Sequence, residues 1–473
     1  MSADEKITAL YTDRYQLAMA LAYWKNGRAD EPACFDYFFR KIPFGGGFVV
    51  SAGLETLLQL LSGLRFTVDD LSYLAREGFP EPFLEELRRF RFRGRIAAAR
   101  EGEPVFPLEP VLRCEGGLLE TQVVETLILN VLNFQSLIAT KAARCVRVAG
   151  DRAVSEFGLR RAQGPGGLWA SRAAAVGGCG STSNLAAGRL YGIPTAGTMA
   201  HSFVQSHDDE LSAFRAFADV HGPGAILLLD TYNTLKSGLP NAIRVAKEME
   251  ERGVALRGVR LDSGDLAYLA RRVREALDAE GLANVSIVAS NRLDEHVIRS
   301  LDEQKAPIDL FGIGTSLAVG LPDAALDGVY KLCMAGNKPR MKFSETVAKA
   351  NFPGVKTVSR YRDEDGFFQA DAIHLAGEDA PDEMRHPWEP AKRLSLAGME
   401  SEPLLHEALV DGERREAPRS TTEIAAYAKE RLALLPPEYH RFENPHVYKV
   451  GLSPGLESLR NDIHRKMEER IEP

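Results

Sequence analysis

Between Gly224 and Thr315 the sequence repeats one pattern four times, in which a short apolar run ends at polar or glycine residues. Helical stretches follow most of the runs. Short apolar runs are typical of buried strands, and strands that alternate with helices form a parallel sheet, often a barrel. In such folds the active site lies on the loops that follow the strands. The pattern therefore predicts both a fold and the rim of a site. The runs are 225–229, 258–261, 285–289 and 308–311.

Length and composition describe an ordinary globular protein. The chain has 473 residues, of which 45% are hydrophobic and 26% charged, and its formal net charge is −8. A chain of this length is expected to form two or three domains. The acidic balance does not favour nucleic acid or an anionic membrane as a partner, so cations that bind an anionic substrate must be concentrated locally.

The N-terminus and the cysteines favour a reducing, cytoplasmic environment. Residues 1–6 lack the basic start and apolar stretch of a signal peptide, and no apolar run approaches the length of a membrane span. The cysteines are odd in number and widely scattered, a pattern of neither a disulfide framework nor a zinc site. They are Cys34, Cys114, Cys145, Cys179 and Cys333.

Regular structure is also expected outside the repeated pattern. Residues 363–445 are rich in Glu, Asp and Pro, which predicts a loop-rich surface appendage. Residues 447–466 return to a strand-then-helix pattern. Helices are predicted over 11–27, 54–62, 81–90 and 121–142, and strands over 35–39 and within 94–115.

Two glycine-rich segments are candidate phosphate-binding loops. Residues 177–184 carry three glycines and then Ser-Thr-Ser-Asn, followed by a helical pattern over 185–191. Residues 311–315, Phe-Gly-Ile-Gly-Thr, follow a predicted strand. Glycine amides and a helix start attract anions, although a capped helix or a tight turn explains each segment alone.

Charged side chains follow the predicted strands. Arg260 and Asp262 are two residues apart, so they project from the same face of a strand. They are suited to gripping an anion and a sugar hydroxyl or metal, or they form an ordinary ion pair. Arg160 and Arg161 suit phosphate because guanidinium binds it in bidentate fashion, yet paired arginines are also common on surfaces.

His201 follows a predicted strand, 194–196. A single histidine is more often structural than catalytic. The chain has no Ser/His/Asp order, P-loop, HExxH motif or convincing dinucleotide fingerprint. These residues therefore favour a group-transfer reaction on a phosphorylated small molecule, in which the protein stabilises charge by electrostatic interactions.

Taken together, these segments resemble the nicotinate phosphoribosyltransferase family over nearly the whole chain. The resemblance implies a type II phosphoribosyltransferase that joins nicotinate to phosphoribosyl pyrophosphate. The products are nicotinate mononucleotide and pyrophosphate, and ATP hydrolysis is coupled to the reaction, the first step of NAD salvage from nicotinate. The segments are 11–20, 38–47, 156–164, 197–202, 230–234, 260–265 and 311–315.

The resemblance also implies an architecture. It predicts an α/β fold, with an irregular, incomplete α/β barrel over 146–345 that carries the active-site loops. An α+β domain over 1–145 is joined by the segment 346–473, which is partly appendage and partly completes the N-terminal domain. A homodimer with shared active sites is implied.

Site roles follow from the resemblance residue by residue. Tyr15, supplied by the partner subunit, would stack on the pyridine ring, and Arg260 would bind the nicotinate carboxylate. His201 would be the phosphohistidine that couples ATP. Asp262 or Asp265 would hold ribose hydroxyls or Mg²⁺, which binds with pyrophosphate and not in a direct protein cage.

The remaining roles concern phosphate groups. Arg160 and neighbouring cations, such as Arg161, would face the pyrophosphate, and Ser202 is a further substrate-binding residue. The ribose 5-phosphate would be cradled by Gly312, Gly314 and Thr315.

Three alternative functions agree less well with the sequence. A nicotinamide enzyme recognises the amide with an Asp in the glycine-rich helix start, whereas no acidic residue occurs from Gly177 to Leu190. Quinolinate enzymes are generally much shorter. A catalytically silent descendant is expected to have lost His201, Arg260 or the glycine loop, and all are present.

Overall fold

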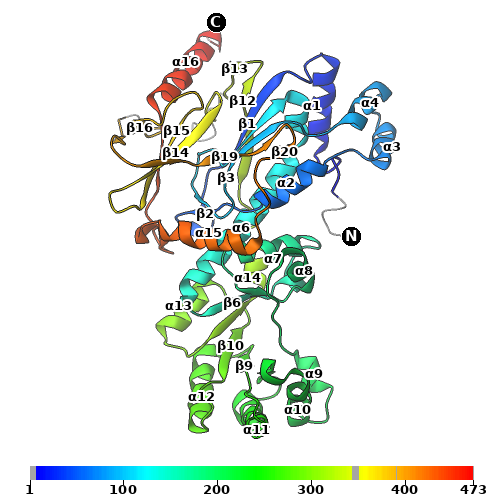
Figure 1. Cartoon of the computed structure of the whole chain (residues 1–473), viewed down its shortest axis with the longest axis vertical. Helices are drawn as coiled ribbons and strands as arrows, with labels where there is room; N and C mark the ends of the chain where they lie inside the picture. Colours follow the sequence, from blue (N-terminus) through cyan, green and yellow to red (C-terminus); the bar gives the residue numbers. More distant parts are fainter. Residues whose placement is uncertain (1–6, 343–350, 390, 472–473) are drawn as a thin grey trace. The chain divides into compact units, whose positions relative to one another are not determined.

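The computed structural model describes residues 7–342, 351–389 and 391–471 (Figure 1). The acidic segment 1–6 lies outside the described residues. The chain forms two compact units. The terminal unit is built from both chain ends, as expected, and the central unit lies between them in sequence. The terminal unit comprises 1–137, 325–419 and 426–473, and the central unit comprises 138–324 and 420–425.

The central unit contains a six-stranded parallel sheet in the order β7-β6-β11-β10-β9-β8. The four apolar runs of the sequence form β8 to β11, which confirms the predicted strands. Both faces of these strands are largely buried, which explains why their sequences do not alternate. The strands are β6 (Ala153–Glu156), β7 (Ser181–Thr182), β8 (Ile226–Leu228), β9 (Gly258–Leu261), β10 (Ser286–Ser290) and β11 (Leu310–Ile313).

Helices alternate with these strands, as the parallel pairing requires. Strands β7 and β8 are the edges of the sheet, so the expected barrel is incomplete within the described residues. The helical segments are α7 (Gly166–Val176), α8 (Leu185–Tyr191), α9 (His201–Gln205), α10 (Glu210–His221), the π-helix η5 (Thr234–Gly238), α11 (Leu239–Glu250), α12 (Leu266–Ala279), α13 (Glu295–Glu303) and α14 (Thr315–Ala318), with short turns η3 (Leu159–Arg161) and η4 (Gly222–Gly224).

The boundary near residue 138 falls inside one continuous helix, α6 (Glu125–Ala149). The predicted boundary at 145/146 also falls within this helix. No glycine or proline interrupts the helix, so the sequence contains no local signal for a domain boundary. The other boundary, at 324/325, precedes β12 (Gly328–Ala335). Because β12 pairs with β1 (Pro32–Phe39), it belongs to the terminal unit and not to the barrel segment 146–345.

The terminal unit contains a seven-stranded sheet in the order β13-β12-β1-β5-β3-β19-β20. Its neighbouring strands are antiparallel, and β1 lies between β12 and β5. The predicted strand over 35–39 is part of β1. The remaining strands are β3 (Arg95–Ala99), β5 (Leu112–Gly117), β13 (Lys338–Pro339), β19 (Leu405–Val410) and β20 (Glu413–Arg414), and β2 (Val49–Val50) pairs separately with β4 (Pro104–Val105).

The helices predicted over 11–27, 54–62, 81–90 and 121–142 are all present, the last divided into two consecutive helices. The side chain of Gln16 accepts the backbone N–H of Asp13 at 2.7 Å, which caps the first helix. No helix of the described chain is both long and apolar enough to cross a membrane. The helices are α1 (Arg14–Lys25), α2 (Leu54–Gly63), α3 (Val68–Arg76), α4 (Glu81–Arg89), α5 (Leu118–Val123) and α16 (Pro454–Ile471), with turns η2 (Pro43–Gly45) and η7 (Pro437–His440). A further helix, α15 (Thr421–Ala433), is divided between the units at 425/426.

Residues 363–445 are not the loop-rich appendage that their composition predicts. They supply β15 (Phe368–Leu375) to a second six-stranded sheet, ordered β17-β16-β21-β15-β14-β18, and β19 to the seven-stranded sheet. Strand β15 is almost wholly buried, although acidic and proline-rich segments flank it and dominate the composition. The other strands are β14 (Lys356–Arg362), β16 (Glu383–Arg385), β17 (Arg393–Ser395), β18 (Ser401–Pro403) and β21 (Lys449–Leu452).

A buried ion cluster centres on Arg360 of β14. Its guanidinium is fully buried and binds Asp371 through Nε at 2.9 Å and Nη2 at 2.6 Å. Nη1 donates to Glu103 at 2.5 Å, and the guanidinium lies 4.7 Å from the centre of the Phe368 ring. Burial of these charges is tolerated because each has an oppositely charged partner.

Replacing Arg360 with leucine should lower the free energy of unfolding by about 3–5 kcal/mol, because the buried carboxylate of Asp371 loses the cation that compensates it. Urea unfolding measures the change. The control is Arg272→Ala, which removes an exposed pair with Glu275 and should have little effect. Similar midpoints for the two variants would contradict this reading of the cluster.

Candidate active site

A cavity of about 390 Å³ lies in the central unit, on the loops after the parallel strands. This is the edge at which the sequence pattern predicted a site. Two arginines, a histidine and an aspartate contribute its charged or titratable groups. The lining residues are Phe157, Arg160, Ser183, Gly197, Thr198, Met199, Ala200, His201, Leu228, Arg260 and Asp262.

Arg260, near the end of β9, is held rigidly in this cavity. Its side chain is 14% exposed, and Nη2 donates to Asp262 at 2.9 Å. Nε donates to Ser290 at 2.9 Å, and Nη1 donates to Thr198 at 2.7 Å and, more weakly, to the Met199 carbonyl at 3.4 Å. The same-face placement of Arg260 and Asp262 is confirmed, and the two form an ion pair.

Asp262 is also tied to the neighbouring strands. Its Oδ1 accepts a hydrogen bond from the hydroxyl of Ser290 at the end of β10. Its backbone N–H donates to Oδ2 of Asp230, just after β8, at 3.1 Å. Oδ2 of Asp230 also accepts from Ser263, while Oδ1 is buried and has no hydrogen-bond partner among the described residues. Asp230 and Asp262 are therefore neighbours on this rim, joined through the backbone of Asp262.

His201 begins helix α9 and is partly open to solvent. Its Nδ1 lies 3.1 Å from the hydroxyl of Thr231, and its Nε2 lies 3.9 Å from Oδ2 of Asp262. The imidazole side chain is 43% exposed. The hydroxyl orients one ring nitrogen, so the other nitrogen faces the carboxylate and the cavity. Ser202, the next residue, is exposed on the same short helix.

The buried carboxylate of Glu156 organises the loop that carries Arg160. It accepts hydrogen bonds from the backbone N–H of Gly158, from the hydroxyl of Ser171 at 2.9 Å and from the hydroxyl of Thr182 at 2.6 Å. The turn η3 follows directly, and both Arg160 and Arg161 are exposed on it. Arg160 lines the cavity, whereas Arg161, the next residue in the sequence, does not.

Gly312 of β11 packs closely against the side chain of Phe157, next to the loop that follows this strand. A Cβ on Gly312 would meet the ring of Phe157 at 2.5 Å, so a side chain there displaces a residue that lines the cavity. Gly314 caps the short helix α14, which Thr315 begins. Thr315 is exposed, and its hydroxyl forms no hydrogen bond with another described residue. The loop thus presents backbone amides and one hydroxyl.

Two predicted residues take other positions. Asp265 caps α12, because its side chain accepts the N–H of Tyr268 at 3.0 Å, so it differs from Asp262, which lines the cavity. Tyr15 lies on α1 of the terminal unit and is 50% exposed. Burial of its phenol and the nearby Glu125 raise the pKa of Tyr15 to about 12, so the ring stays neutral at physiological pH.

Three residues that support the candidate site were missed in the sequence. Glu156 stands in a segment that resembles the family, but nothing in its spacing shows that its carboxylate is a buried acceptor. Asp230 follows an apolar run as Asp262 does, and that parallel was the available signal. Thr198 precedes the histidine by three residues, and only the fold brings it to Arg260.

Comparison with known proteins agrees with this geometry. The family model for nicotinate phosphoribosyltransferase matches residues 153–363, and the models of its N-terminal and C-terminal domains match residues 10–133 and 355–460. The nicotinate phosphoribosyltransferase of Bacillus subtilis is 40% identical, over 98% of this chain and 96% of its own length. The chain belongs to the nicotinate phosphoribosyltransferase family.

A human relative supports the same assignment at the level of structure. Human nicotinate phosphoribosyltransferase is 37% identical over 96% of this chain and 96% of its own length. The crystal structure of human nicotinic acid phosphoribosyltransferase matches with a TM-score of 0.85 at 35% identity, covering 96% of this chain and 99% of that chain. The α/β fold and its second domain are therefore those of the family.

Replacing Gly312 with alanine should destabilise the central unit by about 1–3 kcal/mol, because the new methyl group overlaps the Phe157 ring. Thermal and urea unfolding measure the loss. Gly180→Ala is the matched control, since its Cβ would meet only the Val154 carbonyl, at 4.0 Å. A Gly312 variant as stable as the Gly180 variant would refute the close approach.

Proposed function

We propose that this chain catalyses the ATP-coupled condensation of nicotinate with phosphoribosyl pyrophosphate. The products are nicotinate mononucleotide, pyrophosphate, ADP and phosphate. One observation carries the proposal: in a chain of this family, Arg260, Asp262, His201 and Arg160 line one cavity at the carboxyl edge of the parallel sheet. Their chemistry matches a small anionic ring and a phosphorylated sugar.

Arg260 is the proposed partner of the nicotinate carboxylate. Its four hydrogen bonds use at most four of the five guanidinium N–H groups, so a donor remains while the side chain is already oriented. Preorganisation of this kind reduces the entropy lost on binding. The absence of Asp and Glu from Gly177 to Leu190 supports a carboxylate substrate over an amide.

The phosphates of the second substrate need separate sites. Arg160, exposed at the cavity, is proposed to bind the pyrophosphate through its planar guanidinium. The amides and hydroxyl of Gly312, Gly314 and Thr315 are proposed to receive the ribose 5-phosphate after β11, a common phosphate position in α/β barrels. Arg161 and Ser202 are exposed neighbours that complete the proposed substrate-binding set.

The reaction itself requires little covalent chemistry from the protein. The ring nitrogen of nicotinate attacks the ribosyl carbon as pyrophosphate leaves, and positive charge develops on the sugar. A protein that aligns the two reactants can remove on the order of 7–11 kcal/mol from the barrier in favourable cases. The carboxylate of Asp262, 28% exposed in the cavity, is placed to stabilise a cationic sugar or to bind its hydroxyls.

Mg²⁺ is the proposed metal, and the residues present fit it. This ion prefers oxygen ligands and is usually held by one or two carboxylates together with substrate phosphates. Asp230 offers a buried carboxylate oxygen without a hydrogen-bond partner in the described chain, and Asp262 lies next to it. When bound, the metal would neutralise charge on the pyrophosphate. Asp265 is the weaker candidate because it caps a helix.

ATP is the proposed coupled substrate, with His201 as the phosphorylated residue. Thr231 engages Nδ1 of the imidazole, which leaves Nε2 as the nitrogen to accept a phosphoryl group. The nearby carboxylate of Asp262 can stabilise the charge that develops on the ring. The side chain is open enough for a nucleotide to approach.

The assembly is proposed to be a homodimer in the cytoplasm, with Tyr15 of each subunit stacking on the pyridine ring bound by its partner. A neutral, half-exposed phenol on α1 suits that role.

The proposed function is tested by product formation from phosphoribosyl pyrophosphate and Mg²⁺. Nicotinate, nicotinamide and quinolinate are compared with and without ATP. Nicotinate mononucleotide, formed faster with ATP, is the expected outcome. Activity with nicotinamide alone would show that the base pocket is misassigned, and folded protein inactive with all three bases would overturn the enzymatic assignment.

Arg260→Ala should raise the nicotinate KM by about 10- to 100-fold, because hydrogen bonds to a charged group contribute about 1.5–3 kcal/mol. Steady-state kinetics with phosphoribosyl pyrophosphate at saturation measure the change. The control is Arg257→Ala, an exposed arginine just before the other end of β9. An unchanged KM in the Arg260 variant would remove Arg260 from the base site.

His201→Ala should abolish stimulation by ATP while leaving slow phosphoribosyl transfer, because only the phosphoryl acceptor is removed. Transfer of labelled γ-phosphate to the protein, measured as acid-labile label, gives a second readout. His207→Ala is the control, since that ring packs on Phe203 instead of lining the cavity. Full ATP stimulation of the His201 variant would end the phosphohistidine proposal.

A further inference from the structure

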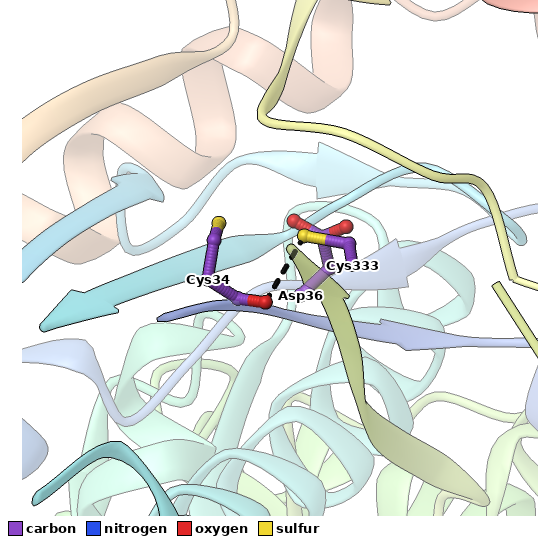
Figure 2. A group of neighbouring side chains, drawn as sticks. All are labelled: Cys34, Asp36 and Cys333. Carbon is purple, nitrogen blue, oxygen red and sulfur yellow. Dashed lines mark hydrogen bonds between the residues drawn. The ribbon is translucent and has the colours of Figure 1, made fainter. Parts of the chain in front are cut away.

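Two strands of the terminal unit, which are distant in sequence, bring together two cysteines and an aspartate. Figure 2 shows Cys34 and Asp36 on β1 and Cys333 on β12. One side-chain ligand atom from each residue lies within 4.8 Å of the other two, and all three residues are buried. None of them belongs to the cavity of the central unit.

Strand geometry explains this convergence. Cys34 and Asp36 are two residues apart on β1, so they project from the same face of the sheet. The β1–β12 pairing is irregular between Cys34 and Phe35, and Cys333 stands in β12 at that irregularity. A bulge of this kind redirects a side chain, here toward the face that carries Cys34 and Asp36.

The carboxylate of Asp36 points to a missing ligand. Its Oδ2 accepts from the ammonium of Lys356 at 2.8 Å, but Oδ1 is buried and has no hydrogen-bond partner in the described part of the chain. Asp36 is only 3% exposed. Buried carboxylate oxygens are almost always satisfied, so an orphan beside two thiols calls for an occupant that accepts electron pairs.

Lys356 does not compete for the thiols. Its ammonium has three donors, and they are used by the carbonyls of Phe352 at 2.7 Å and Gly354 at 2.6 Å and by Asp36. The cation is therefore fixed on Oδ2 of Asp36. Its effect on the cluster is electrostatic, and it sets the charge balance.

Charge balance favours a divalent ion. With both thiols protonated, Asp36 and Lys356 cancel and the buried group is neutral. Exchange of the two thiol protons for one divalent cation keeps the total charge at zero. The negative charges of two thiolates and one carboxylate then equal the positive charges of the metal ion and the ammonium. A buried site that stays neutral avoids the desolvation cost of an uncompensated charge.

We propose that Cys34, Asp36 and Cys333 form a binding site for a thiophilic divalent cation, with Zn²⁺ as the physiological occupant. Two sulfurs and one carboxylate oxygen suit Zn²⁺, whereas Mg²⁺ and Ca²⁺ take oxygen ligands. The fourth tetrahedral position is open to water or to the Cys34 carbonyl, which now accepts the Cys333 thiol at 3.2 Å. The metal clamps strands that are about 300 residues apart in sequence.

Metal content of the untagged full-length chain tests the proposal. The protein is unfolded in denaturant that contains a chelator, which removes bound metal. It is then refolded without metal, with Zn²⁺ or with Co²⁺. We expect one ion per chain, a thiolate-to-cobalt charge-transfer band in the near-ultraviolet, and a higher melting temperature than that of the metal-free protein. Folded protein that holds neither ion would overturn the proposal.

Variants locate the ion. Cys34→Ser and Cys333→Ser should each weaken Zn²⁺ binding by on the order of 100-fold or more, exceeding the effect of a residue that only supports a ligand. Cys114→Ser is the matched control, because Cys114 is a buried cysteine of β5 that pairs with Phe35, on the opposite face from Cys34. Equal binding by all three variants would place the metal elsewhere.

Wild-type protein provides a test that does not depend on folding of the variants. X-ray absorption at the zinc edge should show two sulfur ligands, with Zn–S distances of about 2.3 Å, and the remainder oxygen. A shell of nitrogen and oxygen alone would assign the zinc to surface histidines and carboxylates and refute the site.

Discussion

The ion pair between Arg260 and Asp262 is the interaction on which the site depends. It joins β9 to Ser290 of β10, and Arg260 also reaches Thr198 in the loop that leads to His201. One guanidinium thus fixes the relative positions of two strand ends and the loop that precedes His201. Because Asp262 already neutralises part of the charge of Arg260, the guanidinium attracts an anion less strongly than a free cation would. Binding of an anion at this site therefore depends on the fixed position of the guanidinium as much as on its charge.

Carboxylates that do not themselves line the cavity hold the loops around it. Glu156 holds the N–H of Gly158 and two hydroxyls from α7 and β7, so a buried acceptor sets the path of the loop that presents Arg160. Asp230 plays the corresponding part for the loop after β9. Carboxylates therefore hold the two loops that carry Arg160 and Asp262, and the two arginines that line the cavity give this acidic chain local cations.

The parallel sheet could be predicted because each buried strand is one uninterrupted apolar run, and the placement of Arg260 with Asp262 follows from strand periodicity alone. Contacts across the fold could not. Nothing near Thr198 signals a bond to Arg260, and β15 was hidden because acidic and proline-rich neighbours dominate the composition of 363–445. Cys34 and Cys333 also looked unrelated, since only the pairing of β1 with β12 brings them together.

A crystal structure of the chain with nicotinate mononucleotide bound is the most direct test of the proposed site. We expect the pyridine carboxylate on the guanidinium of Arg260, the 5-phosphate at the segment from Gly312 to Thr315, and Asp262 close to the ribose. A nucleotide bound outside the cavity, or one whose carboxylate contacts a different cation while Arg260 keeps only its present partners, would contradict it.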